Sequence, residues 1–113
     1  MQAKAQAKYI RISPTKARRV VNLIRGQSLE RALGIVDFTP STAGAVVKKV
    51  LASAAANAEN NYGLRKEELW VRECFVDAGV TLKRMHRGSM GRGSIIHKRT
   101  SHITVVLADR EEE

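Results

Sequence analysis

Three histidines, one cysteine and a glycine-rich segment are the residues of this sequence with the chemistry for catalysis or metal binding. His86, His97 and His102 have no cysteine or carboxylate partners at the spacing that metal sites use, and we expect them in strands or loops. Cys74 is followed by Phe75 and Val76, which suggests the interior of a strand and a small buried thiol. The segment GSMGRGS (residues 88–94) lacks the GxxxxGKS/T spacing of a phosphate-binding loop, and the sequence has no GxSxG motif. We therefore predict no catalytic residue, no metal site and no cofactor.

Positive charge is the stronger chemical signal. Lys and Arg outnumber Asp and Glu by 20 to 11, which gives a net charge of +9 and predicts a polyanionic partner. Residues 78–108 contain six Lys or Arg and no carboxylate, and residues 1–36 contain eight with Glu30 as the single acid. Acidic residues gather at Glu67, Glu68, Glu73, Asp77 and Glu111 to Glu113. We therefore expect a polarised molecule, with one side suited to phosphate.

The length of 113 residues suits a single domain over the whole chain, with one modest hydrophobic core. No apolar run approaches the roughly 18 residues needed to cross a bilayer, and the N-terminus has no apolar segment of the kind found in secretory signals. We therefore expect a cytoplasmic protein without membrane contact. Aromatic residues make up only 4% of the sequence, so a stacking platform for single strands is poorly supported, and structured RNA fits better.

Periodicity and capping residues predict the elements that must position these charges. We expect a strand over residues 3–12, helices over residues 14–25, 28–36 and 41–61, and strands over residues 69–76 and 102–108. The first helix has Ser13 as N-cap, Pro14 at the first helical position and Gly26 as a stop, and the third is the clearest prediction because its apolar residues recur at i, i+3, i+4 and i+7. The predicted fold is α+β, with three helices packed on a small antiparallel sheet.

The long segment between the last two strands predicts an extended β-hairpin. Val80, Leu82, Ile95 and Ile96 flank a glycine-rich centre, as expected if both strands run on past the core and turn near Ser89. We place the hairpin at about residues 80–99, projecting from a body of about residues 1–79 and 100–113. An isolated two-stranded ribbon is marginal in water, so a phosphate-lined cleft would support it. The alternative is a solvated, disordered basic loop.

Three segments, in this order, resemble the bacterial large-subunit ribosomal protein L22 family. They are RISPTKARRVVNLIRG (residues 11–26), SAAANAENN (residues 53–61) and KRTSHITVV (residues 98–106), and the resemblance runs nearly end to end. It implies a body bound to large-subunit ribosomal RNA near the outer mouth of the peptide exit tunnel, with a hairpin that lines the tunnel wall. The implied partners are that RNA, neighbouring large-subunit proteins and the nascent peptide. The implied roles are structural, including early subunit assembly in the cytoplasm.

The resemblance and the charge pattern together assign the RNA-binding residues. By position, the N-terminal motif supplies Arg11, Ser13, Lys16, Arg18 and Arg25, the helix-end motif Asn57, Asn60 and Asn61, and the hairpin base Lys98, Arg99, Thr100, Ser101 and His102. To these we add the charged or neighbouring residues Lys4, Lys8, Arg19, Lys49, Lys83, Arg84, Arg87 and Arg92. The expected tunnel-lining tip is Met85, His86, Gly88, Ser89, Met90, Gly91 and Gly93.

The tip departs from the family's usual pattern. That pattern reads Pro-Arg-Ala, a basic residue, then Gly-Arg-Ala, whereas this chain has RGSMGRG at residues 87–93. Gly91 and Arg92 fit, but the proline, one arginine and both alanines are missing. The resemblance therefore implies the hairpin, while the contacts of its tip do not follow from it.

Two other functions remain open on the sequence alone. A free-standing RNA- or DNA-binding regulator would use the same basic face, and a small hydrolase would need an unfamiliar set of residues. Sedimentation with the large subunit after a salt wash distinguishes a ribosomal protein from the regulator. Turnover abolished by a single histidine change would indicate the hydrolase.

Overall fold

Small and β-branched residues at alternate positions build a three-stranded sheet. The structure, a computed structural model, describes residues 2–39, 41–87 and 93–109. The strands are β1 (Gln2–Ile10), β2 (Trp70–Ala78) and β5 (Ser101–Ala108), in the order β1-β5-β2 with both pairs antiparallel. As the middle strand, β5 is buried along almost its whole length, whereas β1 and β2 bury alternate residues along most of theirs. The predicted antiparallel sheet is confirmed.

Serine caps and apolar periodicity define three α-helices. They are α1 (Pro14–Ile24), α2 (Leu29–Asp37) and α3 (Thr42–Tyr62), and a short 3-10 helix, η1 (Lys66–Glu68), follows them. Ser13, Ser28 and Ser41 are the N-caps, and each hydroxyl accepts a hydrogen bond from the backbone N–H three residues later. Gly63 ends α3 in the left-handed conformation, with φ of 66°. The three predicted helices are confirmed within one or two residues at their ends.

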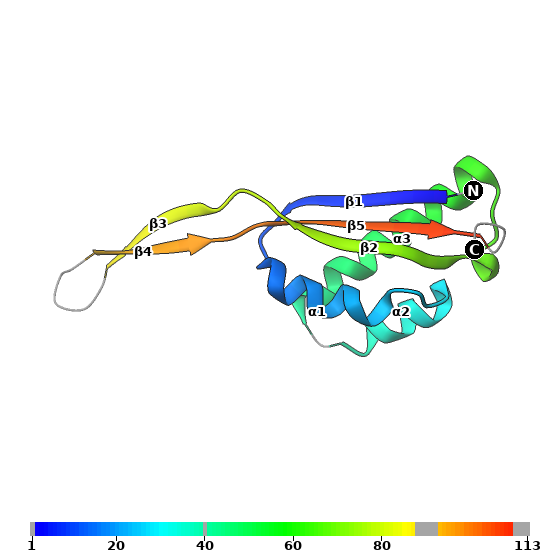
Figure 1. Cartoon of the computed structure of the whole chain (residues 1–113), viewed down its shortest axis with the longest axis horizontal. Coiled ribbons are helices and arrows are strands. Elements are labelled where there is room, and N and C mark those ends of the chain that lie inside the picture. Colours follow the sequence, from blue (N-terminus) through cyan, green and yellow to red (C-terminus); the bar gives the residue numbers. More distant parts are fainter. Residues whose placement is uncertain (1, 40, 88–92, 110–113) are drawn as a thin grey trace.

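The helices cover one face of the sheet, and the hydrophobic core lies between the two layers (Figure 1). Val21 and Ile24 of α1 and Ile103 of β5 are fully excluded from solvent. α3 packs on β1 and β5 through small alanines that include Ala54 and Ala58, which let the helix approach the sheet closely. The α+β architecture predicted from the sequence is therefore confirmed. None of the described helices combines the length and the apolar character needed to span a membrane.

The predicted alternation fails near the end of β1. The register with β5 shifts between Ala7 and Ile10, where Lys8 and Tyr9 together stand opposite His102 in a β-bulge. Tyr9 takes a left-handed backbone conformation, with φ of 58°. β1 pairs once more beyond the bulge, through Ile10 and Ser101, and ends there, two residues earlier than predicted. The Ile12 N–H then donates to the Ile10 carbonyl at 2.8 Å, in a turn that leads toward α1.

The predicted hairpin is present as a second, two-stranded sheet. β3 (Leu82–Arg87) pairs antiparallel with β4 (Gly93–Lys98) and projects from one end of the body (Figure 1). The molecule consequently measures 61 × 25 × 20 Å along its principal axes. The turn expected near Ser89 lies outside the described residues.

The hairpin is not a continuous extension of the core strands. β2 and β3 are separated by residues 79–81, and β4 and β5 by residues 99–100; we call these two connections the hairpin joint. The Gly79 N–H donates to the Thr100 carbonyl at 2.9 Å, but the Val80 carbonyl accepts from the Thr100 hydroxyl at 2.6 Å. A side-chain hydrogen bond thus interrupts the backbone ladder. The prediction of uninterrupted strands is wrong at this joint.

Candidate nucleic-acid interface

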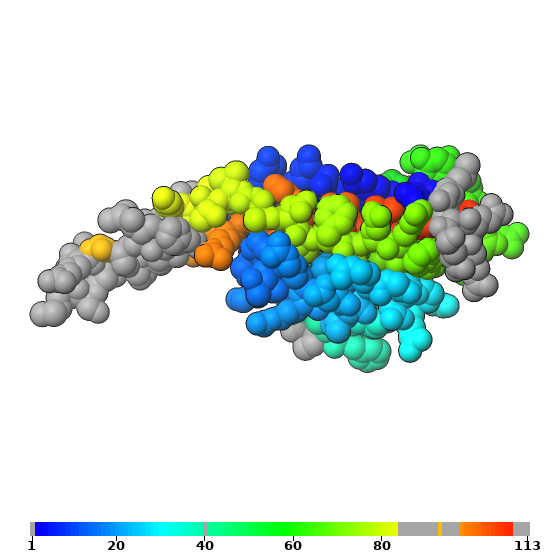
Figure 2. Space-filling view, in the orientation of Figure 1, coloured from blue at the N-terminus to red at the C-terminus, as the bar shows by residue number. Residues whose placement is uncertain are grey.

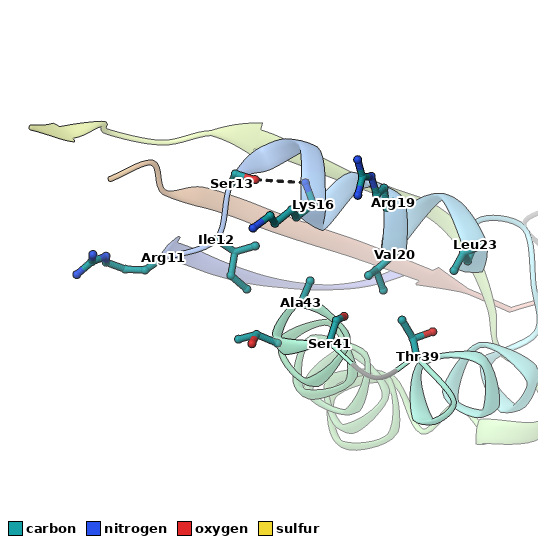
Figure 3. Close-up of a pocket in the computed structure, with 11 residues that line it drawn as sticks. Arg11, Ile12, Ser13, Lys16, Arg19, Val20, Leu23, Thr39, Ser41 and Ala43 are labelled. Carbon is teal, nitrogen blue, oxygen red and sulfur yellow. Dashed lines mark hydrogen bonds between the residues drawn. The ribbon is translucent and has the colours of Figure 1, made fainter. Parts of the chain in front are cut away.

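Basic residues at the start of α1 line the larger of two neighbouring hollows. Ser13 and Pro14 start α1 just after Arg11, so that Arg11, Lys16 and Arg19 all reach one side of the molecule. The hollow has a volume of about 610 Å³ and lies between α1 and the start of α3 (Figure 3). Its lining residues are Arg11, Ile12, Ser13, Lys16, Arg19, Val20, Leu23, Thr39, Ser41, Thr42 and Ala43. Figure 3 shows apolar side chains between the helices, with Arg11 extending outward beyond them.

A second hollow connects this site to the base of the hairpin. It has a volume of about 270 Å³ and is lined by Arg11, Ser13, Lys98 and Arg99. Figure 2 shows the yellow and orange base of the hairpin directly beside the blue start of α1. The two hollows share Arg11 and Ser13, so they form one surface, which we call the cationic groove. Its basic residues are Arg11, Lys16, Arg19, Lys98 and Arg99, and all five are exposed.

The electrostatics of the cationic groove favour an extended anion. No aspartate or glutamate is among the residues that line either hollow. Five positive charges in a shared groove repel one another unless counterions or a ligand neutralise them. α1 and α3 also direct their N-terminal, electropositive ends toward this side. A chain of phosphodiesters supplies negative charge at regular intervals and fits such a groove.

Two predicted RNA-binding arginines are engaged by the protein itself. The Arg18 guanidinium donates to the Val76 carbonyl from Nε at 3.3 Å and from Nη2 at 3.0 Å. The Arg25 guanidinium donates to the Cys74 carbonyl at 2.7 Å. β2 is an edge strand, so these arginines satisfy carbonyls that no neighbouring strand reaches. Arg18 and Arg25 are seven residues apart, which predicts that they lie on the same side of a helix. The sequence alone does not show that this side faces the edge of β2.

Three of the five predicted residues of the hairpin base, Thr100, Ser101 and His102, are engaged within the protein. Thr100 is 5% exposed and Ser101 fully buried, and the Ser101 hydroxyl donates to the Ile12 carbonyl. The half-buried His102 accepts the Tyr9 N–H at Nδ1, at 3.1 Å. Ser101 and His102 fasten the start of β5 to the N-terminal segment, and the Thr100 hydroxyl joins the two connections of the hairpin joint to each other. We therefore leave them out of the proposed RNA contacts.

The remaining predicted residues of the body lie away from the cationic groove. Lys4 and Lys8 are exposed on β1, Lys49 is exposed on α3, and Asn60 and Asn61 are exposed near the end of α3. Half-buried Asn57 donates from Nδ2 to the Lys4 carbonyl at 3.0 Å, which joins α3 to β1. These residues offer a second polar surface and do not extend the groove.

The structure describes some of the predicted hairpin residues and not others. Lys83 is exposed on β3, Arg84, Met85, His86 and Arg87 follow it along the same strand, and Gly93 begins β4. The other predicted residues of the tip, Gly88, Ser89, Met90, Gly91 and Arg92, lie outside the described residues.

The environment of Cys74 is that of a structural thiol. Burial raises the pKa of the Cys74 thiol above its ordinary value, and the nearby Arg25 guanidinium offsets this only in part. The thiol donates to the Val21 carbonyl, with Sγ 3.1 Å from the oxygen. Within the described ranges, no three His, Cys, Asp or Glu side chains come together as potential metal ligands.

Comparison with known proteins identifies one family. The family described as Ribosomal protein L22p/L17e matches residues 5–108. The chain is 59% identical over 112 residues to the large ribosomal subunit protein uL22 of Desulforamulus reducens, and 55% identical over 112 residues to that of Pelotomaculum thermopropionicum; each alignment covers 99% of both proteins. It is 54% identical to the uL22 protein of a Thermotoga species, covering 100% of this chain and 71% of the relative.

Proposed function

The chain belongs to the ribosomal protein L22p/L17e family and is a structural constituent of the large ribosomal subunit, and we propose that it binds the ribosomal RNA of that subunit through the cationic groove. Members of this family are structural proteins and not enzymes. Family membership favours a place in the cytoplasmic large subunit over the free-standing regulator and the hydrolase that the sequence left open.

One observation carries the RNA-binding proposal: five exposed basic side chains line connected hollows that contain no carboxylate. Most surface cations of a soluble protein are interspersed with acids, which neutralise them locally. Here the neutralising charge must come from outside the chain. Backbone phosphates of folded RNA provide it, and releasing their condensed counterions adds favourable free energy.

The hairpin supports a second part of the proposal, a contact with the nascent-peptide exit tunnel. In the described part of the chain, β3 and β4 form a sheet of their own, separate from the sheet of the body. A two-stranded ribbon buries too little apolar surface to be stable alone in water. We propose that ribosomal RNA surrounds it and that its far end lines the tunnel beside the nascent peptide.

The distribution of polar residues supports a role in subunit assembly. The cationic groove reaches the base of the hairpin through Lys98, while the rest of the hairpin and the Asn60 and Asn61 end of α3 lie outside the groove. Each offers a surface for a different RNA segment, and neighbouring large-subunit proteins are further candidates for the remaining surface. Holding several segments on one rigid body raises their effective concentration, which would favour early folding of the subunit.

The groove proposal is tested by the salt dependence of binding to large-subunit ribosomal RNA. We compare the wild-type chain with a variant carrying Arg11→Gln, Lys16→Gln and Arg19→Gln. The control carries Arg31→Gln, Arg65→Gln and Lys66→Gln, which removes the same charge from α2 and the segment around η1.

We expect the groove variant to bind more weakly and its slope of log K against log salt to flatten by about two to three, because about one counterion is released per phosphate contact. The control should keep a slope near that of the wild type. Equal changes in both variants would show that net charge alone drives binding and would contradict the groove.

A further inference from the structure

Tyr9 has an unusual backbone conformation for its residue type. It lies in the β-bulge of β1 with φ of 58°, the one non-glycine residue with positive φ in the described ranges. Side chains with a Cβ atom rarely adopt this region, and such strain persists only where the surrounding structure holds it. Strained residues of this kind cluster at binding sites, so the conformation calls for a functional explanation.

His102 holds Tyr9 in this conformation. The Tyr9 N–H donates to His102 Nδ1 at 3.1 Å, and the two rings form an edge-to-face contact with centroids 4.8 Å apart. Gly79 leaves room for the histidine, because a Cβ atom there would lie 3.1 Å from His102 Cε1. The Tyr9 ring is thus oriented by its contact with His102 of β5, and the hairpin joint packs against that histidine.

The fixed ring is directed outward. Tyr9 is 63% exposed, although an aromatic ring of its size loses favourable burial by facing water. The edge-to-face contact occupies one part of the ring and leaves the rest accessible. A pre-oriented, exposed aromatic ring binds a planar partner at low entropic cost.

We propose that Tyr9 stacks on an unpaired base of the ribosomal RNA, as a base-binding residue beside the cationic groove. The charges around it favour a nucleotide, since Lys8 precedes it and Arg11 of the groove follows two residues later. Two residues span at most about 7 Å of backbone, so one nucleotide or two adjacent ones can reach both the ring and the arginine. This is a single stacking contact, which a chain with few aromatic residues can still make. The inference rests on the proposed RNA-binding function.

The test measures binding of the full chain to large-subunit ribosomal RNA over a range of salt concentrations. Tyr9→Phe keeps the ring and removes the hydroxyl, whereas Tyr9→Asn and Tyr9→Gly remove the ring with residues that tolerate positive φ. We expect Tyr9→Phe to bind like the wild type. We expect both ring-less variants to bind about 5- to 100-fold more weakly with an unchanged salt slope, because stacking releases no phosphate counterions. Thermal unfolding should stay cooperative in all three variants.

The outcomes separate this inference from the function on which it rests. Wild-type affinity in both ring-less variants would overturn the stacking contact while leaving RNA binding intact. An equal loss in Tyr9→Phe would also overturn it, because the hydroxyl would then be the contact. A wild-type chain that shows no salt-dependent RNA binding would instead overturn the proposed function. If Tyr9→Asn does not fold, Tyr9→Gly decides, since glycine has no Cβ strain at this φ.

Discussion

At the scale of single residues, buried hydroxyls connect segments that are far apart in the sequence. The Ser101 side chain is fully buried, and its hydroxyl donates to the Ile12 carbonyl, 89 residues away. A buried carbonyl oxygen that loses its hydrogen-bond donor has no water to replace it, so the free-energy cost of removing it from water is no longer offset. The Ser101 hydroxyl therefore fastens β5 to the segment that leads into α1, and through it helps to position the cationic groove.

We predict that Ser101→Ala lowers the free energy of unfolding by about 1–3 kcal/mol, because the Ile12 carbonyl is left without this donor. Urea unfolding measures the effect. The matched control is Ser53→Ala at an exposed position of α3, where we expect no loss because alanine favours a helix. Equal effects at both positions would contradict the anchoring role of Ser101.

A second prediction concerns the pH dependence of stability. Because burial raises the pKa of Cys74 in the folded chain, its neutral thiol is favoured by folding. The stabilisation that this neutral thiol gives the folded state is fully present below the ordinary thiol pKa. It is lost as the pH rises through the raised pKa of the folded state. The difference in unfolding free energy between the wild type and Cys74→Ala should therefore narrow from about pH 7 to about pH 10. Other titrating groups are common to both proteins, so a constant difference would count against this explanation.

Sequence reasoning at this scale identifies residue types more readily than their partners. Burial of Cys74 follows from its apolar neighbours and is confirmed. The resemblance instead assigned Thr100 and Ser101 to RNA contacts, whereas their hydroxyls donate to Val80 and Ile12. Those partners depend on the three-dimensional path of the chain, which neither charge nor periodicity encodes.

At the scale of elements, the hairpin joint determines how the arm is attached to the body. Gly79 lies against Thr100, and a Cβ atom at position 79 would be 2.5 Å from the Thr100 hydroxyl oxygen. That hydroxyl already donates to Val80 in the same joint. The joint is thus closely packed, and a methyl group added at position 79 must displace the Thr100 hydroxyl.

We predict that Gly79→Ala lowers the free energy of unfolding by about 1–3 kcal/mol, as overpacking does elsewhere. Gly34→Ala is the matched control, because no atom lies within 4 Å of its added Cβ and the residue lies inside α2. There we expect a gain of about 0.5–1 kcal/mol from helix propensity. Thermal or urea unfolding of both variants measures whether each substitution lowers or raises the free energy of unfolding. A stabilised Gly79→Ala variant would show that the joint is loosely packed.

The hairpin and the groove should contribute separately to RNA binding. In the test variant, an Asn-Gly turn replaces residues 85–95. These two residues then link Arg84 to Ile96, its partner in the pairing of β3 with β4. We expect most of the affinity for large-subunit ribosomal RNA to remain, since the groove is intact, while the tunnel lining changes. Filter binding compares this variant with the groove variant. Near-complete loss of binding would contradict this division of roles.

The elements with strong local signals were predicted best. α3 combines a serine cap, an apolar stripe and a terminal glycine, and its bounds agree with the prediction within one residue. The bulge at Tyr9 and the interruption of the strands at Gly79 were not predicted. Both depend on contacts with β5 or its flanking residues, and tertiary contacts of this kind leave no periodic pattern in the sequence.

At the scale of the whole molecule, charge and shape are distributed along one long axis. The cationic groove lies at the end of the body from which the hairpin projects, and α2 and η1 lie toward the opposite end (Figure 1). Exposed Glu67 and Glu68 belong to η1, whereas Glu73 and Asp77 lie along β2. Glu67 and Glu68 thus lie away from the groove, as expected, but Arg65 and Lys66 beside them balance their charge, and the acids of β2 are spread along the strand. The acidic tail lies outside the described residues.

From the position of the cationic groove we expect the molecule to take a preferred orientation on RNA. The 61 Å long axis places the hairpin ahead of the groove, so an RNA surface that binds the groove also receives the arm. The α2 and η1 end then faces away from the phosphates. Attraction of the cationic groove by phosphates favours this orientation, because Arg65 and Lys66 balance the acids of η1 and leave that end without a net positive charge of its own.

The most direct test of this account is a density map of the large ribosomal subunit that contains this chain. We expect Arg11, Lys16 and Arg99 to lie within charge-assisted hydrogen-bonding distance of backbone phosphates, with β3 and β4 enclosed by RNA. A map in which the cationic groove faces solvent, while the α2 and η1 end contacts the RNA, would contradict it.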